Sequence, residues 1–168
     1  MSDYTRSTIE CSVNQLRPEL RRAIVEYFQK NTLGEVETET LLCCETVSEK
    51  KEPGWLASLL GDQMEPPIYT AVLLTSTNLV WARGGLQSGV TVTGADLGFI
   101  RVKPYASIFI SDAGLQISGI IGGSASMSGY IGMEPGPVLE KFCDEVQQAI
   151  ARANPSSTKK WPSWMGGR

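Results

Sequence analysis

The sequence predicts an α+β protein in which strands predominate. We expect a closed or nearly closed antiparallel barrel, with one amphipathic helix before it and another after it. Two apolar runs across a short polar break predict a β-hairpin at residues 68–83. Glycine and proline then recur at short intervals up to residue 137, which is typical of short antiparallel strands. Apolar stripes of helical period flank this region at residues 14–31 and 137–153.

The N-terminal segment contains one clear element. Residues 1–13 are polar and unpatterned, so we expect a loose N-terminus. The stripe over residues 14–31 predicts a helix that begins with Asn14 as its cap or with Pro18 as its first residue, and that ends by Gly34. Because an apolar stripe must leave water, this helix packs on the strands that follow, on a second copy or on a partner; its arginines alternatively face an anionic surface.

Residues 35–47 are expected to form the first strand. Strand alternation places Val36 and Leu42 on one face, and it points the adjacent Cys43 and Cys44 to opposite faces. A row of carboxylates would suit a hard cation such as Ca²⁺, but the simpler interpretation is a solvated face that discourages edge-to-edge pairing. Three such residues begin the face opposite Val36: Glu35, Glu37 and Glu39.

Residues 48–67 form the first long connection, and they contain an amphipathic stretch. A loop of this length either folds back to cap the open end of the sheet or provides an apolar contact surface. The C-terminal tail, residues 154–168, contains two further apolar anchors that dock on their own domain or on a partner. The candidate binding residues of the loop and the tail are Lys50, Lys51, Trp55, Leu59, Leu60, Trp161 and Trp164.

The strands after the hairpin are short, and the final helix is strongly patterned. Pro137 suits the first turn of a helix over residues 137–153, and Phe142 and Val146 lie on its apolar face. Gly122 and Gly123 are expected to form a hairpin turn, and Gly94 and Pro104 are expected to interrupt strands. The predicted strand runs are residues 90–93, 97–102, 107–111, 115–121 and 126–133.

The residue types present argue against several kinds of chemistry. Histidine is absent, which removes the usual general base and the commonest metal ligand. The phosphate-binding patterns GxxxxGK[ST] and GxGxxG do not occur. The cysteines have no CxxC spacing and are expected to be reduced structural thiols: Cys11, Cys43, Cys44 and Cys143. We therefore predict no catalytic residues, no cofactor and no metal site.

The order of these elements resembles the bacterial pleckstrin-homology-like (PH-like) domains. The likeness covers residues 35–153 and rests on LLTSTNLVWARGG, on the strand AGLQISG and on the helix pattern Val138-Leu139-x-x-Phe142. It implies a bent antiparallel sheet or partly open barrel of about seven strands, closed by the C-terminal amphipathic helix, with Phe142 and Val146 against Trp81 or its neighbours. The N-terminal helix is extra to this family pattern. It implies little about function, because only Lys50 and Lys51 occupy the positions where phosphoinositide-binding relatives cluster basic residues.

The predicted organisation is an N-terminal segment (residues 1–34), a PH-like domain (35–153) and a tail (154–168). A net charge of −3 argues against nucleic-acid binding. The chain shows neither a membrane-spanning apolar run nor the features of a signal peptide, so we expect it in the cytoplasm. The predicted function is a non-catalytic binding or scaffold module that contacts another protein or itself. Peripheral binding to anionic lipid through residues 48–67 is the alternative, and a small apolar ligand inside the barrel is a third possibility.

Overall fold

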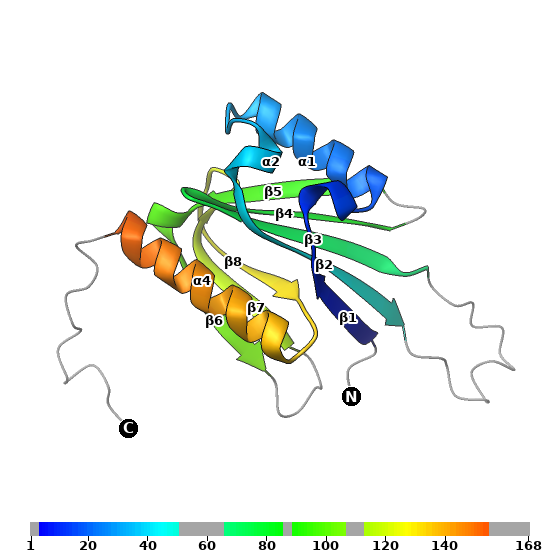
Figure 1. The fold of residues 1–168 in the computed structure, drawn as a ribbon. Coiled ribbons are helices and arrows are strands. Elements are labelled where there is room, and N and C mark those ends of the chain that lie inside the picture. Colours follow the sequence, from blue (N-terminus) through cyan, green and yellow to red (C-terminus); the bar gives the residue numbers. More distant parts are fainter. Residues whose placement is uncertain (1–3, 51–65, 86–88, 107–112, 155–168) are drawn as a thin grey trace, which may run out of the picture.

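The structure is a computed structural model that describes residues 4–50, 66–85, 89–106 and 113–154. It confirms an α+β fold in which strands predominate, with a helix on either side of the strand region (Figure 1). The strands form two antiparallel sheets rather than one closed barrel. Sheet A has the order β1-β2-β3-β4-β5: Tyr4–Glu10, Thr40–Lys50, Ile68–Thr75, Asn78–Gly85 and Thr91–Asp96. Sheet B has the order β6-β7-β8: Ile100–Ala106, Ala113–Ile121 and Ser124–Gly132.

The helices cover one face of each sheet. They are α1 (Pro18–Lys30), α2 (Val36–Glu39) and α4 (Pro137–Ala153), with 3₁₀ turns η1 (Val13–Gln15) and η2 (Leu97–Phe99). Helix α1 packs on β3, β4 and β5 at the outer face of sheet A, whereas α4 packs mainly on β6 (Figure 1). The predicted apolar stripe of the first helix is therefore buried within its own chain.

Sheet A separates two apolar cores. One core lies between α1 and the outer face of sheet A, and the other lies between the two sheets and α4. Cys43 belongs to the first and Cys44 to the second, which confirms that their side chains point to opposite faces. Strand β3 is therefore apolar on both faces, which explains why it is a nearly continuous apolar run in the sequence.

The N-terminal strand β1 was not predicted. Where a loose N-terminus is expected, Tyr4–Glu10 pairs with β2 from Tyr4↔Lys50 to Glu10↔Cys44. Only Thr8 of this strand is buried, and its hydroxyl lies 2.9 Å from that of Thr46. Strand β1 is held by backbone pairing and polar contacts and not by an apolar face. Its sequence therefore lacks the apolar alternation from which a strand is predicted.

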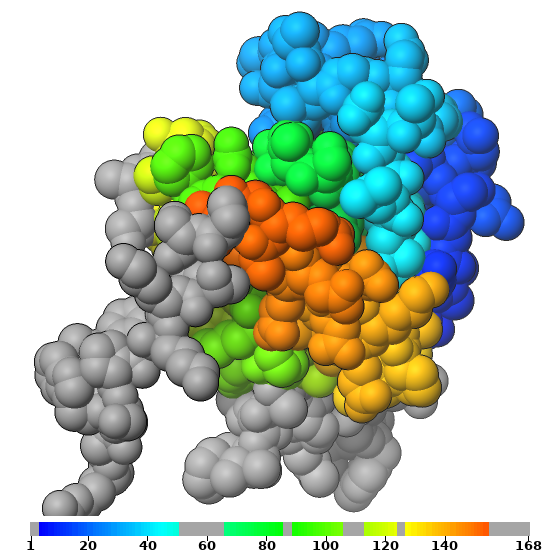
Figure 2. All heavy atoms as spheres, turned by 60° about the vertical axis from the view of Figure 1, so that its left-hand side comes forward, coloured from blue at the N-terminus to red at the C-terminus, as the bar shows by residue number. Residues whose placement is uncertain are grey.

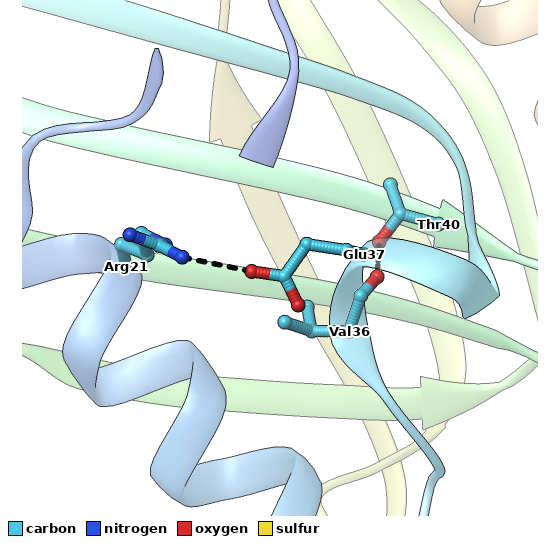
Figure 3. A network of polar contacts seen from close by, with 4 residues as sticks. All are labelled: Arg21, Val36, Glu37 and Thr40. Atoms are coloured by element: carbon cyan, nitrogen blue, oxygen red, sulfur yellow. Dashed lines mark hydrogen bonds and ion pairs between the residues drawn. The ribbon is translucent and has the colours of Figure 1, made fainter. Parts of the chain in front are cut away.

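Residues 35–39 also differ from the prediction. Val36–Glu39 forms the short helix α2, so the three carboxylates do not share a strand face. Glu37 instead accepts a 3.0 Å hydrogen bond from the guanidinium of Arg21, and the Thr40 hydroxyl donates to the Val36 carbonyl at 2.6 Å (Figure 3). Strand β2 lies between β1 and β3, so it has no edge to protect. Within the described ranges no acidic or cysteine cluster could hold a metal ion.

The hairpin and the C-terminal helix match the sequence closely. Strands β3 and β4 meet across Ser76 and Thr77, and α4 begins at Pro137 as predicted. The side chain of Phe142 is fully buried in the core between the sheets, and Trp81 packs against the same core. Gly122 and Gly123 form the β7–β8 turn with φ of +59° and +75°, again as predicted.

Two expected breaks lie inside strands instead. Gly94 is within β5, where a side chain would collide with the Tyr27 hydroxyl of α1. Pro104 is within β6, which is tolerated because β6 is an edge strand of sheet B. The strand predicted at residues 107–111 lies outside the described residues.

Candidate docking surface on sheet B

The structure locates only one of the residues predicted to bind. Lys50 is the last residue of β2, where it is half-buried opposite Tyr4. The other candidates lie outside the described residues and stay predictions: Lys51, Trp55, Leu59, Leu60, Trp161 and Trp164.

Sheet B has one face that no described helix or strand covers. Its inner face contributes Val102, Leu115, Ile117 and Ile131 to the core that α4 closes. The residues that alternate with these point the other way, and most of them are exposed. We call this the bare face, and it consists of Arg101, Lys103, Tyr105, Gln116, Ser118, Ile120, Ser128 and Tyr130.

Two tyrosines form the centre of this face. The rings of Tyr105 and Tyr130 meet edge to face, with centroids 5.3 Å apart and planes at 81°. The Tyr130 hydroxyl donates a 2.5 Å hydrogen bond to the Ala113 carbonyl, so the ring extends along the sheet. Burial raises the pKa of Tyr130, against the opposing effect of the Arg6 charge.

Two glycines lie in the same cross-strand row as Tyr105. Gly114 pairs with Tyr105 on one side and with Gly132 on the other, so this row has no other side chain on the bare face. A Cβ at Gly132 would lie 2.5 Å from Nε of Arg6, and the Arg6 guanidinium is 6.0 Å from the Tyr130 ring centroid. The sequence does not predict this cluster, because Arg6 is in the segment expected to be loose. The sequence signal for this cluster is glycine within a strand, because such a glycine often marks a place where another group approaches the backbone closely.

Two depressions adjoin Tyr105. The first, which we call the tyrosine hollow, is a volume of about 330 Å³ lined by Tyr105, Gln116, Ser128, Gly129 and Tyr130. The second, the helix groove, is a volume of about 430 Å³ between β6 and the start of α4, and its lining includes Pro104, Tyr105, Leu139, Glu140 and Asp144. In Figure 2 the orange surface of α4 adjoins the green surface of β6. Tyr105 lines both depressions and therefore joins them into one continuous surface.

The two depressions differ in charge. The bare face contains the cations Arg101 and Lys103, and Arg6 borders it, while none of its eight residues is acidic. Lys103 is exposed and forms no ion pair within the described part of the chain. The helix groove instead contains the carboxylates Glu140 and Asp144.

The backbone of β6 offers little for strand addition. The Val102 carbonyl accepts a 3.4 Å hydrogen bond from the Gln147 amide of α4, so it points away from β7 and toward the helix. Pro104, two residues later, has the same orientation and lacks an N–H. Recognition at this surface therefore depends on side chains, which here are cations, phenols, hydroxyls and an amide.

No family model matches the chain, and no curated protein matches its sequence. None of the helices in the described ranges is both long and apolar enough to cross a membrane.

Proposed function

We propose that the protein is a non-catalytic interaction module that binds an acidic, extended segment of another protein across the bare face of sheet B. The observation that carries this proposal is the face of sheet B that no helix or strand of the described ranges covers. It contains the tyrosine hollow, it is bordered by cations, and none of its eight residues is acidic. Tyrosine and arginine are enriched in protein interfaces, and both are present here.

The electrostatics favour an acidic partner. Lys103 is an exposed, unpaired cation in the part of the chain that the structure describes, and it lies across the sheet from Gln116 and Tyr130. A carboxylate that reaches the tyrosine hollow can therefore bind the Lys103 ammonium and accept bonds from the neighbouring amide. Because the chain as a whole has a net charge of −3, the attraction for an acidic segment is confined to this face.

A protein partner suits this surface better than a lipid bilayer. The face is rich in hydrogen-bonding groups, and Ile120 is the only aliphatic residue among its eight members. Two other exposed apolar residues, Phe99 and Met127, lie only at the end of the sheet where Ile100 pairs with Gly119 and Gly119 pairs with Met127. Shallow membrane insertion requires a larger apolar face than this one. The lipid alternative through residues 48–67 stays a separate prediction, because Ser48–Lys50 belong to β2 and residues 51–65 lie outside the described residues.

We also propose a PH-like fold in the cytoplasm. The order of elements supports this fold: four strands of sheet A (β2–β5), three strands of sheet B (β6–β8), and α4 packed against the core between them, with β1 and α1 as additions. The cysteines Cys11, Cys43, Cys44 and Cys143 are all free thiols, which suits a reducing compartment.

A peptide selection tests the binding proposal. Random peptides displayed on phage are selected on the immobilised full-length protein, and the enriched sequences are synthesised and titrated. We expect acidic sequences whose affinity falls with added salt. Lys103→Glu should weaken them about tenfold or more, since it replaces an attraction with a repulsion. Lys30→Glu is the matched control, because it makes the same charge change at the exposed end of α1 on the far side of sheet A.

Three results would contradict the proposal. The first is that the enriched peptides lack acidic residues. The second is that Lys30→Glu weakens peptide binding as much as Lys103→Glu does. The third is that no peptide binds, whereas phosphatidylserine vesicles bind the wild type and not the Lys103→Glu variant, which would assign the bare face to a lipid surface.

A further inference from the structure

Two cysteine thiols lie side by side next to a cavity whose lining includes no residue of the bare face. Cys11 follows the last residue of β1, Cys43 is within β2, and their sulfur atoms are 3.9 Å apart. Both are on the α1 side of sheet A, where Cys43 is part of the core under α1 and Cys11 packs against it.

The backbone brings the pair within reach of a disulfide. The Cys11 N–H donates a 3.0 Å hydrogen bond to the Cys43 carbonyl, which continues the β1–β2 register beyond Glu10↔Cys44. Residues that face each other in such a hydrogen-bonded pair have Cα atoms about 5.5 Å apart, inside the range of roughly 4.4–6.8 Å that disulfides span. Rotation of the two side chains is therefore sufficient to shorten the distance between the sulfur atoms from 3.9 Å to about 2.05 Å, and the strands need not move.

A small oxidant can reach one of the two sulfurs. Cys11 is half-buried, and with Cys43 it lines a cavity of about 250 Å³. Helix α2 contributes Glu37 to the same cavity, and the Arg21–Glu37 bond holds that helix against α1 (Figure 3). Cys43 is only 3% exposed, so reaction from solvent begins at Cys11.

The electrostatics make Cys11 the nucleophile of the pair. The hydrogen bond from Cys43 lowers the pKa of the Cys11 thiol, against the opposing effects of burial and of the Glu45 carboxylate. The same hydrogen bond and burial raise the pKa of Cys43. Because a thiolate is a stronger nucleophile than a thiol, Cys11 attacks the oxidant first, and Cys43 reacts second, as it gives up its proton.

We propose that Cys11 and Cys43 form an oxidation site, in which a hydroperoxide converts the thiol pair into an intrachain disulfide. In the first step the Cys11 thiolate attacks a peroxide oxygen; the O–O bond breaks, an S–O bond forms, and the leaving oxygen takes up a proton. In the second step the Cys43 sulfur attacks the Cys11 sulfenic acid; an S–S bond forms and the hydroxyl leaves as water with the Cys43 proton. The two thiols lose two electrons and two protons, and the peroxide is reduced to alcohol and water.

The remaining cysteines do not share these features. Cys44 points into the core between the sheets, is 1% exposed, and has a pKa raised by burial to about 12. Cys143 lies on α4 in the same core, and burial also raises its pKa. The disulfide is therefore specific for Cys11 and Cys43, and it encloses the chain that forms η1, α1 and α2.

Hydrogen peroxide applied to the reduced full-length protein tests the proposal. After treatment, the protein is unfolded and alkylated, and its intact mass gives the number of free thiols. We expect two alkylated thiols instead of four, and a tryptic cross-link between residues 7–21 and 31–50. The disulfide should raise the thermal midpoint of the oxidised protein by roughly 10 °C.

Single variants identify the partners, because Cys43 and Cys44 occur in the same tryptic peptide. Cys44→Ala should still form the cross-link, whereas Cys11→Ser and Cys43→Ala should lose it. Circular dichroism under reducing conditions shows which variants are folded. If Cys43→Ala does not fold, the other two variants are sufficient: the cross-link must be lost in Cys11→Ser and kept in Cys44→Ala. The proposal is overturned by four alkylated thiols in the oxidised wild type, by loss of the cross-link in Cys44→Ala, or by a disulfide between two chains.

Discussion

Replacing Glu45 with glutamine is expected to destabilise the protein more than replacing Glu37 with glutamine. Both carboxylates accept a bond from an arginine of the α1 region at similar distance, 3.1 Å for Arg17–Glu45 and 3.0 Å for Arg21–Glu37. The two pairs differ in burial, since the side chain of Glu45 is 9% exposed and that of Glu37 is 38% exposed. The comparison therefore keeps the ion-pair distance nearly constant, while burial and the number of contacts of the pair differ.

The magnitude follows from the contacts of each carboxylate. Glu45 accepts both the backbone N–H and the Nε of Arg17, whose guanidinium lies 3.7 Å from the Tyr69 ring centroid. Hydrogen bonds to charged groups contribute about 1.5–3 kcal/mol and neutral ones about 0.5–1.5 kcal/mol, so Glu45→Gln should cost about 1.5 kcal/mol. Glu37 makes one exposed ion pair, and such pairs contribute about 0.5 kcal/mol or less.

Urea unfolding of two double-mutant cycles measures both energies. One cycle combines Glu45→Gln with Arg17→Met, and the other combines Glu37→Gln with Arg21→Met. We expect a coupling free energy of about 1–2 kcal/mol for the first cycle and about 0.5 kcal/mol or less for the second. Glu45→Gln should also lower the thermal midpoint by roughly 3–6 °C.

Equal coupling in the two cycles, or stronger coupling in the exposed pair, would refute this reasoning. The exposed pair also has a pH signature. The hydrogen bond from Arg21 lowers the pKa of Glu37 in the folded state. Its contribution should therefore be present above the pKa of an unfolded glutamate and should disappear as the pH falls through the lowered folded value.

Three further predictions concern other parts of the molecule. Cys11 should react with iodoacetamide at a lower pH than an ordinary thiol, whereas Cys44 should stay unreactive until the protein unfolds; peptide mapping at several pH values checks both. Gly119→Ala should cost about 3 kcal/mol or more in urea unfolding, because φ is +133° and a Cβ would lie 2.1 Å from the Phe99 carbonyl oxygen, while Gly123→Ala in open space should cost about 1 kcal/mol. A chain that begins at Leu33 should lose its cooperative thermal transition, because it exposes the core that α1 covers; a stable monomer of this length would contradict that expectation.

The elements that the sequence predicted correctly are those with strong apolar periodicity. Helix α4 buries Phe142 and Val146 on the expected face, and the β3–β4 hairpin turns at the expected residues. Strand β1 was missed because it is an edge strand in which only Thr8 is buried. Helix α2 was missed because, over so few residues, alternation around Val36 suits a strand as well as a helical turn.

The candidate docking surface was beyond prediction for a different reason. It combines Arg6 of β1 with Tyr105 and Tyr130 of sheet B, so it exists only once the two sheets are packed. Similarly, Cys11 and Cys43 are far apart in the sequence, and their proximity depends on the pairing of an unpredicted strand. Local patterns can identify elements, but they contain no information about such contacts.

The two apolar faces of sheet A have a consequence for how its strands find their partners. In β3, Leu73 faces α1 and Leu74 faces sheet B, so a slip by one residue would replace one apolar set with another at little hydrophobic cost. Correct alignment must therefore come from polar groups. Thr75 is one of these, because its hydroxyl accepts a 2.8 Å hydrogen bond from the Asn78 N–H at the turn. Loss of such groups would favour chains with shifted strand pairing, which remain compact and yet fail to assemble the surfaces described above.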